Sequence, residues 1–398
     1  MEELYTLEKE VGRGSYGVVF EGHMTRTGQK VAIKRLPCYN PECIELYLQE
    51  LWVMRATAQN HVNIIALHGC LLQTGPRSLK PLRAGKLPPH LVESVLKGRV
   101  VGAPQERTPP PSFIKRRSHS TTRLLDRTNT IQVGVKPRDK SRVSDSTTPQ
   151  RPRSVRKRSA RRDEDQSASL GSSALWLVME YCDGGDLNQF LLSRRPDAER
   201  NHSVLRQLSS AVAFLHKLGI VHRDLKPDNV LVCDTPTGPT IKVADFGLSK
   251  MSAGLTEGGL PRQHFSSTCG SDFYMAPEVW GGLSYTAQAD IFSLGVMFWA
   301  VLERITFLEE GSTQEQLGAY VCKGRSGWLM PLGEAMWENA DTQLCIPMKS
   351  KRAPPLPPPP GPAMCALLLD MLASDPDCRP PADQLQTRVN AALDEDSH

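Results

Sequence analysis

The chain has 398 residues, enough for one large domain or two ordinary ones, and a formal net charge of +5. Apolar residues make up only 39% and there are 31 prolines, so we expect part of the chain to be disordered. Residues 75–165 hold 23 Lys/Arg against 8 Asp/Glu, and the remainder holds 25 against 35, so a mildly acidic body carries one strongly basic segment.

Cysteine usage and hydropathy exclude several protein classes. None of the ten cysteines forms a C-x-x-C pair, and Cys70 and Cys233 lie in apolar runs. This favours reduced, buried thiols in a cytosolic or nuclear protein over a disulfide framework or a zinc site. The first ten residues contain no apolar signal core, and no stretch approaches the roughly 18 apolar residues of a membrane span, so we expect no membrane partner.

The first predicted elements form a hairpin with a glycine-rich tip. Leu4–Val11 predicts a strand, and a G-x-G-x-x-G pattern follows at 12–17. A dinucleotide-binding fold would begin a helix directly after such glycines. Here residues 18–22 continue as a β-branched strand towards a turn at Thr27-Gly28. Because glycines let the backbone approach phosphates closely, this hairpin predicts a phosphate-covering loop.

A strand and a helix follow the hairpin. Lys30–Arg35 predicts the strand, and Lys34 lies behind three apolar residues, where a lone lysine is costly unless it is paired. Ile44–Arg55 has helical periodicity. This helix offers two partners for the lysine, Glu45 and Glu50.

A long insertion, 75–173, separates the fourth strand, which ends near Gln73, from the fifth, Leu175–Glu180. It is rich in Ser, Thr, Pro, Arg and Lys and poor in aromatic residues, so we expect it to be largely disordered. Residues 90–96 (HLVESVL) are more apolar than the rest of the insertion. They predict a local strand or short helix that packs against the N-terminal strands.

The densest basic run, Arg151–Arg162, permits four interpretations. We favour a nuclear import signal, which fits a short basic cluster. A nucleic-acid contact fits the charge, but no aromatic residues interleave the run for base stacking, so we do not expect this partner. A solvated linker and docking on the acidic body are the other two interpretations. Phosphorylation of Ser154 or Ser159 would lower the local charge.

The stretch Val221–Val230 (VHRDLKPDNV) concentrates reactive groups. Asp224 offers a base for a hydroxyl, Lys226 a cation for a phosphate, and Asn229 an oxygen ligand for a metal. Two predicted strands, at 229–233 and 240–244, then lead to Asp245-Phe246-Gly247, which adds a second oxygen ligand. Phosphoryl transfer needs this set because its transition state spreads negative charge over oxygens.

The order H-R-D-L-x-x-x-N at 222–229 and D-F-G at 245–247 resembles the catalytic core of protein kinases. The resemblance implies an α+β bilobal fold, with a small β-rich N-lobe that carries one helix and a larger α-rich C-lobe. It implies ATP and Mg²⁺ as cofactors and proteins as substrates. Lys226 after Leu225 is the pattern of kinases that act on Ser and Thr.

The resemblance also implies roles for single residues. Asp224 would accept or orient the proton of the substrate hydroxyl, and Lys226 would neutralise the γ-phosphate. Lys34 would contact the α- and β-phosphates and pair with Glu50, which fits the family's pattern better than Glu45. The implied Mg²⁺ ligands are Asn229 and Asp245. The implied ATP-binding residues are Val11, Gly12, Arg13, Gly14, Ser15, Tyr16, Gly17, Val18, Val19, Ala32, Lys34, Met179, Glu180, Cys182, Asp186 and Leu231.

Residues 179–187 (MEYCDGGDL) resemble the hinge between the kinase lobes. The backbone of Glu180 and Cys182 would bind adenine, and Asp186 would contact ribose. Helices are then predicted at 186–193 and at Ser203–Lys217.

The resemblance extends to regulatory and structural positions. Arg223 would receive a phosphate from an activation-loop residue, and Ser271 would contact Asp224. His222 would support the D-F-G segment, and Arg379 would form an ion pair with Glu278. The activation-loop residues in question are Ser266, Ser267 and Thr268.

A second insertion, 349–362, is proline-rich and predicts an exposed polyproline II segment. Arg352, Pro355 and Pro358 fit an R-x-x-P-x-x-P pattern, so residues 352–360 are a site for an SH3 or WW partner or a rigid spacer.

We therefore expect one kinase domain over 4–390, with an N-lobe at 4–180 and a C-lobe at 183–390. The strings CDGGDLNQFLLSR (182–194) and KVADFGLSK (242–250), among others, resemble the Clik/PDIK subgroup of Ser/Thr kinases. That subgroup implies a location in the nucleus, the cytoplasm or both. The rival interpretation is a kinase-fold scaffold that recruits partners through its insertions, and the complete set of catalytic residues argues against it.

Overall fold

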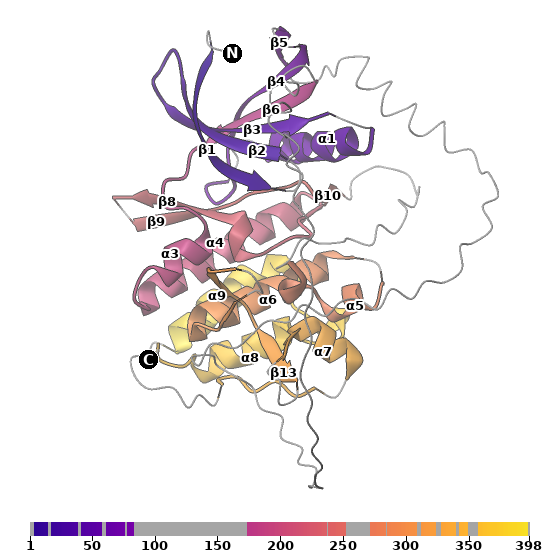
Figure 1. Cartoon of the computed structure of the whole chain (residues 1–398). Coiled ribbons are helices and arrows are strands. Elements are labelled where there is room, and N and C mark those ends of the chain that lie inside the picture. The colour runs from indigo at the N-terminus through magenta and orange to yellow at the C-terminus, as the bar shows by residue number, and fades with distance from the viewer. Residues whose placement is uncertain are drawn as a thin grey trace, which may run out of the picture.

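The computed structural model describes residues 4–14, 17–38, 41–57, 61–75, 78–82, 173–236, 238–251, 271–283, 285–308, 312–323, 328–339, 342–348 and 357–396. Figure 1 shows a β-sheet with one helix lying above a larger, mainly helical body. The α+β bilobal fold expected from the sequence is confirmed.

One antiparallel sheet and helix α1 form the N-lobe. The sheet has the strand order β1-β2-β3-β6-β4-β5. The bounds are β1 Tyr5–Gly14, β2 Gly17–Met24, β3 Lys30–Pro37, α1 Pro41–Ala56, β4 Leu67–Gly75, β5 Ser78–Pro81 and β6 Ala174–Glu180. Tyr47, Leu51 and Met54 of α1 are buried in the same core as Leu36 and Leu177 of the sheet, so α1 packs against the sheet.

Strand β5 corrects the predicted start of the long insertion. We expected the insertion to begin at residue 75, but Ser78–Pro81 pairs with β4 in the antiparallel register Leu72↔Lys80. These four residues form the edge strand of the sheet. Their backbone groups gain hydrogen bonds to β4 by pairing with it. The element at 90–96, the predicted disorder and the run Arg151–Arg162 lie outside the described residues.

The C-lobe is built mainly from helices. Its helices are α3 Leu187–Leu192, α4 Ala198–Lys217, α5 Pro277–Trp280, α6 Ala287–Glu303, α7 Leu332–Glu338, α8 Pro362–Met371 and α9 Ala382–Glu395. Its 3₁₀ turns are Pro227–Asn229, Ser271–Tyr274 and Pro376–Cys378. Its short strands are β7 Ile220–Val221, β8 Val230–Thr235, β9 Gly238–Val243, β10 Lys250–Met251, β11 Thr306–Leu308, β12 Glu315–Leu317, β13 Tyr320–Lys323 and β14 Trp328–Pro331.

Helix α6 is the centre of the C-lobe (Figure 1). Every residue from Ala289 to Glu303 is buried, as expected for a helix that is apolar on all sides. The helix ends at Arg304, whose left-handed backbone (φ 51°) stops further helical turns. In the part of the chain that the structure describes, no helix is long and apolar enough to cross a membrane.

Two predicted boundaries need correction. We expected the domain to end at 390, but α9 continues to Glu395 and buries Leu393 against the C-lobe core. The second insertion was expected to end at 362, but Pro362 is already the first residue of α8, since proline is well suited to the first turn of a helix. Residues 349–356, which include Arg352 and Pro355, lie outside the described residues.

Candidate active site

Lys34 joins three elements at the junction of the lobes. It lies in the middle of β3, between Val19 of β2 and Leu177 of β6, and its side chain is buried. Its Nζ lies 2.7 Å from Glu50 Oε1 on α1 and 3.1 Å from Asp245 Oδ1. The structure therefore brings Lys34, Glu50 and Asp245 together.

Electrostatics keep this lysine charged. Burial alone would lower the pKa of Lys34, but the Glu50 and Asp245 carboxylates outweigh burial and hold that pKa above its ordinary value. Burial raises the pKa of Glu50, and the Lys34 charge opposes that rise. The Lys34 charge lowers the pKa of Asp245, whose side chain is 43% exposed. A positive charge is thus fixed beside a solvent-facing carboxylate.

Asp224 lies at the centre of a second group of residues, in the loop between β7 and β8. Lys226 Nζ is 3.1 Å from Asp224 Oδ2, and Asn229 Nδ2 donates to the same oxygen at 2.8 Å. Asn229 Nδ2 also donates to the Asp224 backbone carbonyl at 2.8 Å. This short loop can bring the three groups together because the 3₁₀ turn Pro227–Asn229 reverses the chain between Lys226 and β8.

Asn229 and Asp245 suit a divalent cation. Since the Asn229 amide nitrogen is bonded to Asp224, its amide oxygen is directed away from that carboxylate. Amide and carboxylate oxygens are the hard ligands that Mg²⁺ prefers, and Mg²⁺ usually takes few protein ligands together with substrate phosphates. Within the described ranges no three His, Cys, Asp or Glu side chains form a metal-binding cluster.

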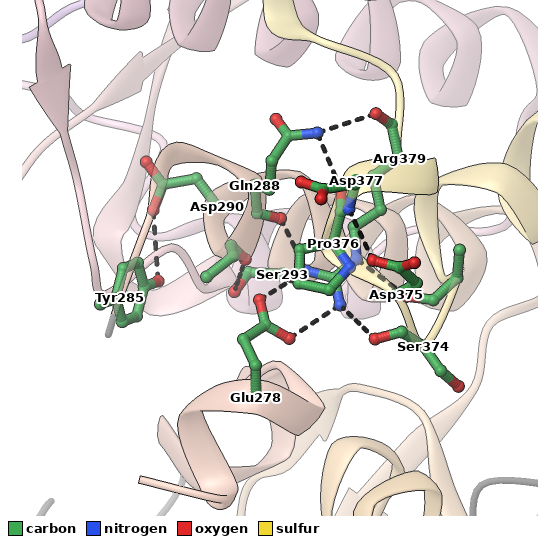
Figure 2. A network of polar contacts seen from close by, with 12 residues as sticks. Glu278, Tyr285, Gln288, Asp290, Ser293, Ser374, Asp375, Pro376, Asp377 and Arg379 are labelled. Atoms are coloured by element: carbon green, nitrogen blue, oxygen red, sulfur yellow. Dashed lines mark hydrogen bonds and ion pairs between the residues drawn. The ribbon is translucent and has the colours of Figure 1, made fainter. Parts of the chain in front are cut away.

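Sequence reasoning missed the residue that shapes the catalytic loop, Asp290 of α6. Its Oδ2 accepts hydrogen bonds from the His222 backbone N–H at 2.8 Å and lies 2.9 Å from His216 Nε2. Its Oδ1 accepts from the Arg223 N–H at 2.9 Å. The same oxygen accepts from the Tyr285 hydroxyl at 3.3 Å (Figure 2). The available signal was an aspartate at the start of an otherwise apolar run, because buried carboxylates need partners.

His222 has the structural role expected of it. Its Nε2 lies 3.0 Å from the carbonyl oxygen of Ala244, the residue before the D-F-G segment. The centroid of its imidazole ring lies 5.3 Å from the centroid of the Phe246 ring. Asp245, between these two contacts, has a positive φ of 59°, a conformation that such contacts must hold in place.

The predicted hinge connects β6 with the C-lobe. The Glu180 N–H donates to the Ala66 carbonyl at 3.0 Å, and the Glu180 carboxylate accepts from the Ala66 N–H at 2.7 Å. Asp186 accepts from the Gln189 N–H at 2.9 Å and so caps α3. The predicted contacts of Glu180 and Cys182 with adenine and of Asp186 with ribose stay predictions.

The strands around the predicted adenine position are in register. Ala32 of β3 pairs with Met179 of β6, and Val19 of β2 pairs with Lys34. Leu231 of β8 forms a bridge with Asp186.

The glycine-rich hairpin is formed as expected, with Gly14 opposite Gly17. A Cβ on Gly17 would lie 2.3 Å from the Arg35 carbonyl oxygen, so this position excludes any side chain. Val11, Gly12, Arg13 and Val18 lie in the same strand pair, and Ser15 and Tyr16 lie outside the described residues.

Glu278 and Arg379 form the ion pair predicted from the sequence, and this prediction is confirmed. Two bonds join the guanidinium to the carboxylate, at 2.7 and 2.8 Å, and both side chains are buried (Figure 2). The same guanidinium donates to the Gln288 carbonyl at 3.0 Å, which connects the pair to α6. The three proposed phosphorylation sites, 266–268, and the side chain of Ser271 are not among the described parts.

Comparison with protein families agrees with this geometry. The model described as "Protein kinase domain" matches residues 163–389, more than half of the chain. The chain belongs to the protein kinase family. A second model, "Protein tyrosine and serine/threonine kinase", matches residues 5–130 of this kinase chain.

Individual Ser/Thr kinases are similar to part of this chain. Serine/threonine-protein kinase 33 of Mus musculus is 35% identical over 183 residues, 44% of this chain and 36% of its own length. Serine/threonine-protein kinase unc-51 of Caenorhabditis elegans is 38% identical over 161 residues, 38% of this chain and 18% of its own. Serine/threonine-protein kinase DCLK2 of Rattus norvegicus is 36% identical over 171 residues, 42% and 21% of the two chains. The aligned region thus covers well under half of each relative.

Proposed function

We propose that this chain transfers the γ-phosphate of ATP to Ser and Thr hydroxyls of protein substrates. The observation that carries the proposal is the group of Asp224, Lys226 and Asn229. The Lys226 ammonium nitrogen and the Asn229 amide nitrogen both lie within 3.1 Å of Asp224 Oδ2. Lys34, held between Glu50 and Asp245, supplies the second half of the site.

Each group has a chemical task in this reaction. Asp224 orients the substrate hydroxyl and accepts its proton, and Lys226 stabilises the charge on the transferring phosphoryl group. Lys34 binds the α- and β-phosphates. Asn229 and Asp245 would hold Mg²⁺, which neutralises charge on the phosphate oxygens when bound. The scaffold alternative is not favoured, because the contacts among Lys34, Glu50 and Asp245 and among Asp224, Lys226 and Asn229 support the catalytic proposal.

Phosphoamino-acid analysis tests the substrate class. The full chain is incubated with γ-labelled ATP, Mg²⁺ and mixed protein substrates, and the products are hydrolysed in acid. We expect labelled phosphoserine and phosphothreonine. Label found in phosphotyrosine alone would contradict the proposal, and the variant Lys34→Met serves as the control for a contaminating kinase.

We also propose membership of the Clik/PDIK subgroup, with a location in the nucleus, the cytoplasm or both. The basic run Arg151–Arg162 supports import into the nucleus. A reporter fused to residues 151–162 should enter the nucleus, and one that stays cytoplasmic would refute this role.

An SH3 or WW partner at 352–360 is proposed from the R-x-x-P-x-x-P spacing, and a peptide of residues 349–362 that binds no such domain would refute it.

A further inference from the structure

Two thiols meet between the hinge and the C-lobe. Cys182 Sγ, in the hinge after β6, lies 2.9 Å from Cys233 Sγ on β8. Backbone hydrogen bonds hold the two segments side by side: the Gly184 N–H donates to Val232 O at 2.8 Å, and the Val232 N–H donates to Gly185 O at 2.9 Å. The thiol contact is therefore built into the connection between hinge and strand.

The separation is close to that of a disulfide. Both cysteines are free thiols in the structure, and neither is fully buried. A disulfide bond is about 2.05 Å long, so the two sulfur atoms need to approach by less than about 1 Å. The paired backbone already provides the proximity that bond formation requires.

The environment makes one of the two sulfurs the better nucleophile. The hydrogen bond between the thiols lowers the pKa of Cys233, and the same bond, together with burial, raises the pKa of Cys182. The charge of Lys242 also lowers the pKa of Cys233, whereas burial and the nearby charges of Glu180 and Asp183 raise it. Because the thiolate is the reactive form, this direction makes Cys233 the expected site of first oxidation.

We propose that Cys182 and Cys233 form a reversible oxidation site that closes to a disulfide when the chain meets hydrogen peroxide. The Cys233 thiolate attacks one peroxide oxygen, the O–O bond breaks, and hydroxide leaves and is protonated to water. The sulfur of Cys182 then attacks the Cys233 sulfenic acid, loses its proton, and releases a second water. Two thiols and one peroxide thus yield one disulfide and two waters.

A disulfide of this kind suits a regulatory role. In reducing compartments disulfides are transient and serve catalysis or redox sensing. Reduction by a second thiol, such as dithiothreitol, restores the free pair through thiol–disulfide exchange.

The consequence for ATP rests on the proposed function. Cys182 lies at the position expected to donate its backbone N–H to adenine, and the new bond draws its side chain towards β8. Hydrogen bonds weaken when the donor shifts from its preferred distance and angle. We expect ATP affinity to fall by up to about tenfold in the oxidised chain, the worth of one hydrogen bond.

Peptide mapping tests the site directly. The full chain is treated with hydrogen peroxide, the remaining thiols are blocked, and the protein is digested with trypsin without reduction. Residues 163–194 and 224–242 form two tryptic peptides with a single cysteine each, Cys182 and Cys233. We expect the cross-linked pair, absent after dithiothreitol. Oxidation of the exposed Cys378 without this cross-link would overturn the proposal.

Matched variants separate this proposal from the kinase proposal. Cys233→Ser should keep the ATP affinity of the reduced chain and lose its peroxide sensitivity, whereas Cys378→Ser should behave as wild type. Cys233→Ala repeats the test if the serine variant fails to fold. Peroxide sensitivity that survives in Cys233→Ser would overturn the site. A reduced wild type that binds no ATP would overturn the kinase proposal. The disulfide proposal would still be testable, because the mass of the cross-linked peptides is measured without ATP.

Discussion

The backbone N–H of Arg223 donates to Asp290 Oδ1 at 2.9 Å across a separation of 67 residues. Arg223 has a φ of 72°, a left-handed conformation that is costly for a residue with a Cβ. Asp290 is fully buried in α6, and its second oxygen holds the neighbouring His222. Because Asp224 follows Arg223 directly, Asp290 is a positioning residue for Asp224.

The variant Asp290→Asn should therefore lose both activity and stability. An amide cannot accept all four hydrogen bonds, so buried donors are left without partners at a cost of about 2–4 kcal/mol in the free energy of unfolding. A displaced Asp224 should lower kcat about 100-fold. Urea unfolding and phosphate transfer measure the two effects. Asp383→Asn, on the exposed face of α9, should change neither.

The stabilisation from Asp290 should also depend on pH. Burial opposes the charged form, but the His216 hydrogen bond and charge outweigh it and lower the pKa of Asp290. A group whose pKa is lower in the folded state stabilises above its unfolded pKa, about 3.9 for Asp, and loses this effect as pH falls through the folded pKa. The difference in unfolding free energy between wild type and Asp290→Asn should narrow as pH is lowered from 6 towards 3. A difference that widens would refute the assignment.

Glu50→Gln should change the metal requirement of the kinase. Lys34 Nζ lies between Glu50 and Asp245, so loss of the Glu50 charge strengthens the pull of Asp245 on the lysine. Asp245 is a proposed Mg²⁺ ligand, so we expect a several-fold higher Mg²⁺ concentration for half-maximal activity and a kcat lower by about tenfold. Magnesium titrations at saturating ATP measure both. Glu45→Gln on the same helix should leave both values unchanged.

Arg379→Ala should destabilise the C-lobe by about 3–5 kcal/mol, because it leaves the buried Glu278 carboxylate without its partner. Chemical denaturation measures this loss. Arg388→Ala removes the exposed pair with Asp370 and should cost less than about 1 kcal/mol. Equal losses in the two variants would contradict the view that burial decides the worth of these pairs.

Gly17→Ala should disturb the phosphate-covering hairpin. Its Cβ would meet the Arg35 carbonyl oxygen at 2.3 Å, so β2 must move away from β3, at a cost of about 1–3 kcal/mol. We expect a lower unfolding temperature and a higher KM for ATP. Gly12→Ala is the matched comparison, because its Cβ would make only an ordinary contact at 3.9 Å with Val19. A smaller effect for Gly17→Ala than for Gly12→Ala would refute this explanation.

The resemblance to protein kinases predicted the fold, and the short spacing in the sequence was enough to predict the groups around Asp224. Asn229 lies only five residues from Asp224, so their spacing in the sequence alone predicted that the two side chains are close together. The partner of Lys34 needed the family pattern, because periodicity allowed both Glu45 and Glu50.

Local patterns could not predict contacts between distant segments, and the Glu278–Arg379 pair was predicted only from the family resemblance. Asp290 reaches the catalytic loop only because α6 packs beneath it, and no spacing rule relates positions 67 residues apart. The Cys182–Cys233 contact has the same cause, since the pairing of the hinge with β8 brings together residues that are 51 positions apart. Strand β5 was missed because the composition of its four residues matches that of the insertion that follows.

Phosphate transfer by wild type and by Asp224→Ala tests the central claim most directly. Both proteins are incubated with labelled ATP, Mg²⁺ and generic protein substrates, and folding is checked by thermal unfolding. We predict transfer by the wild type and a loss of at least about 1,000-fold in the variant, because the group that orients the hydroxyl and accepts its proton is gone. Equal transfer by the two folded proteins would contradict the account.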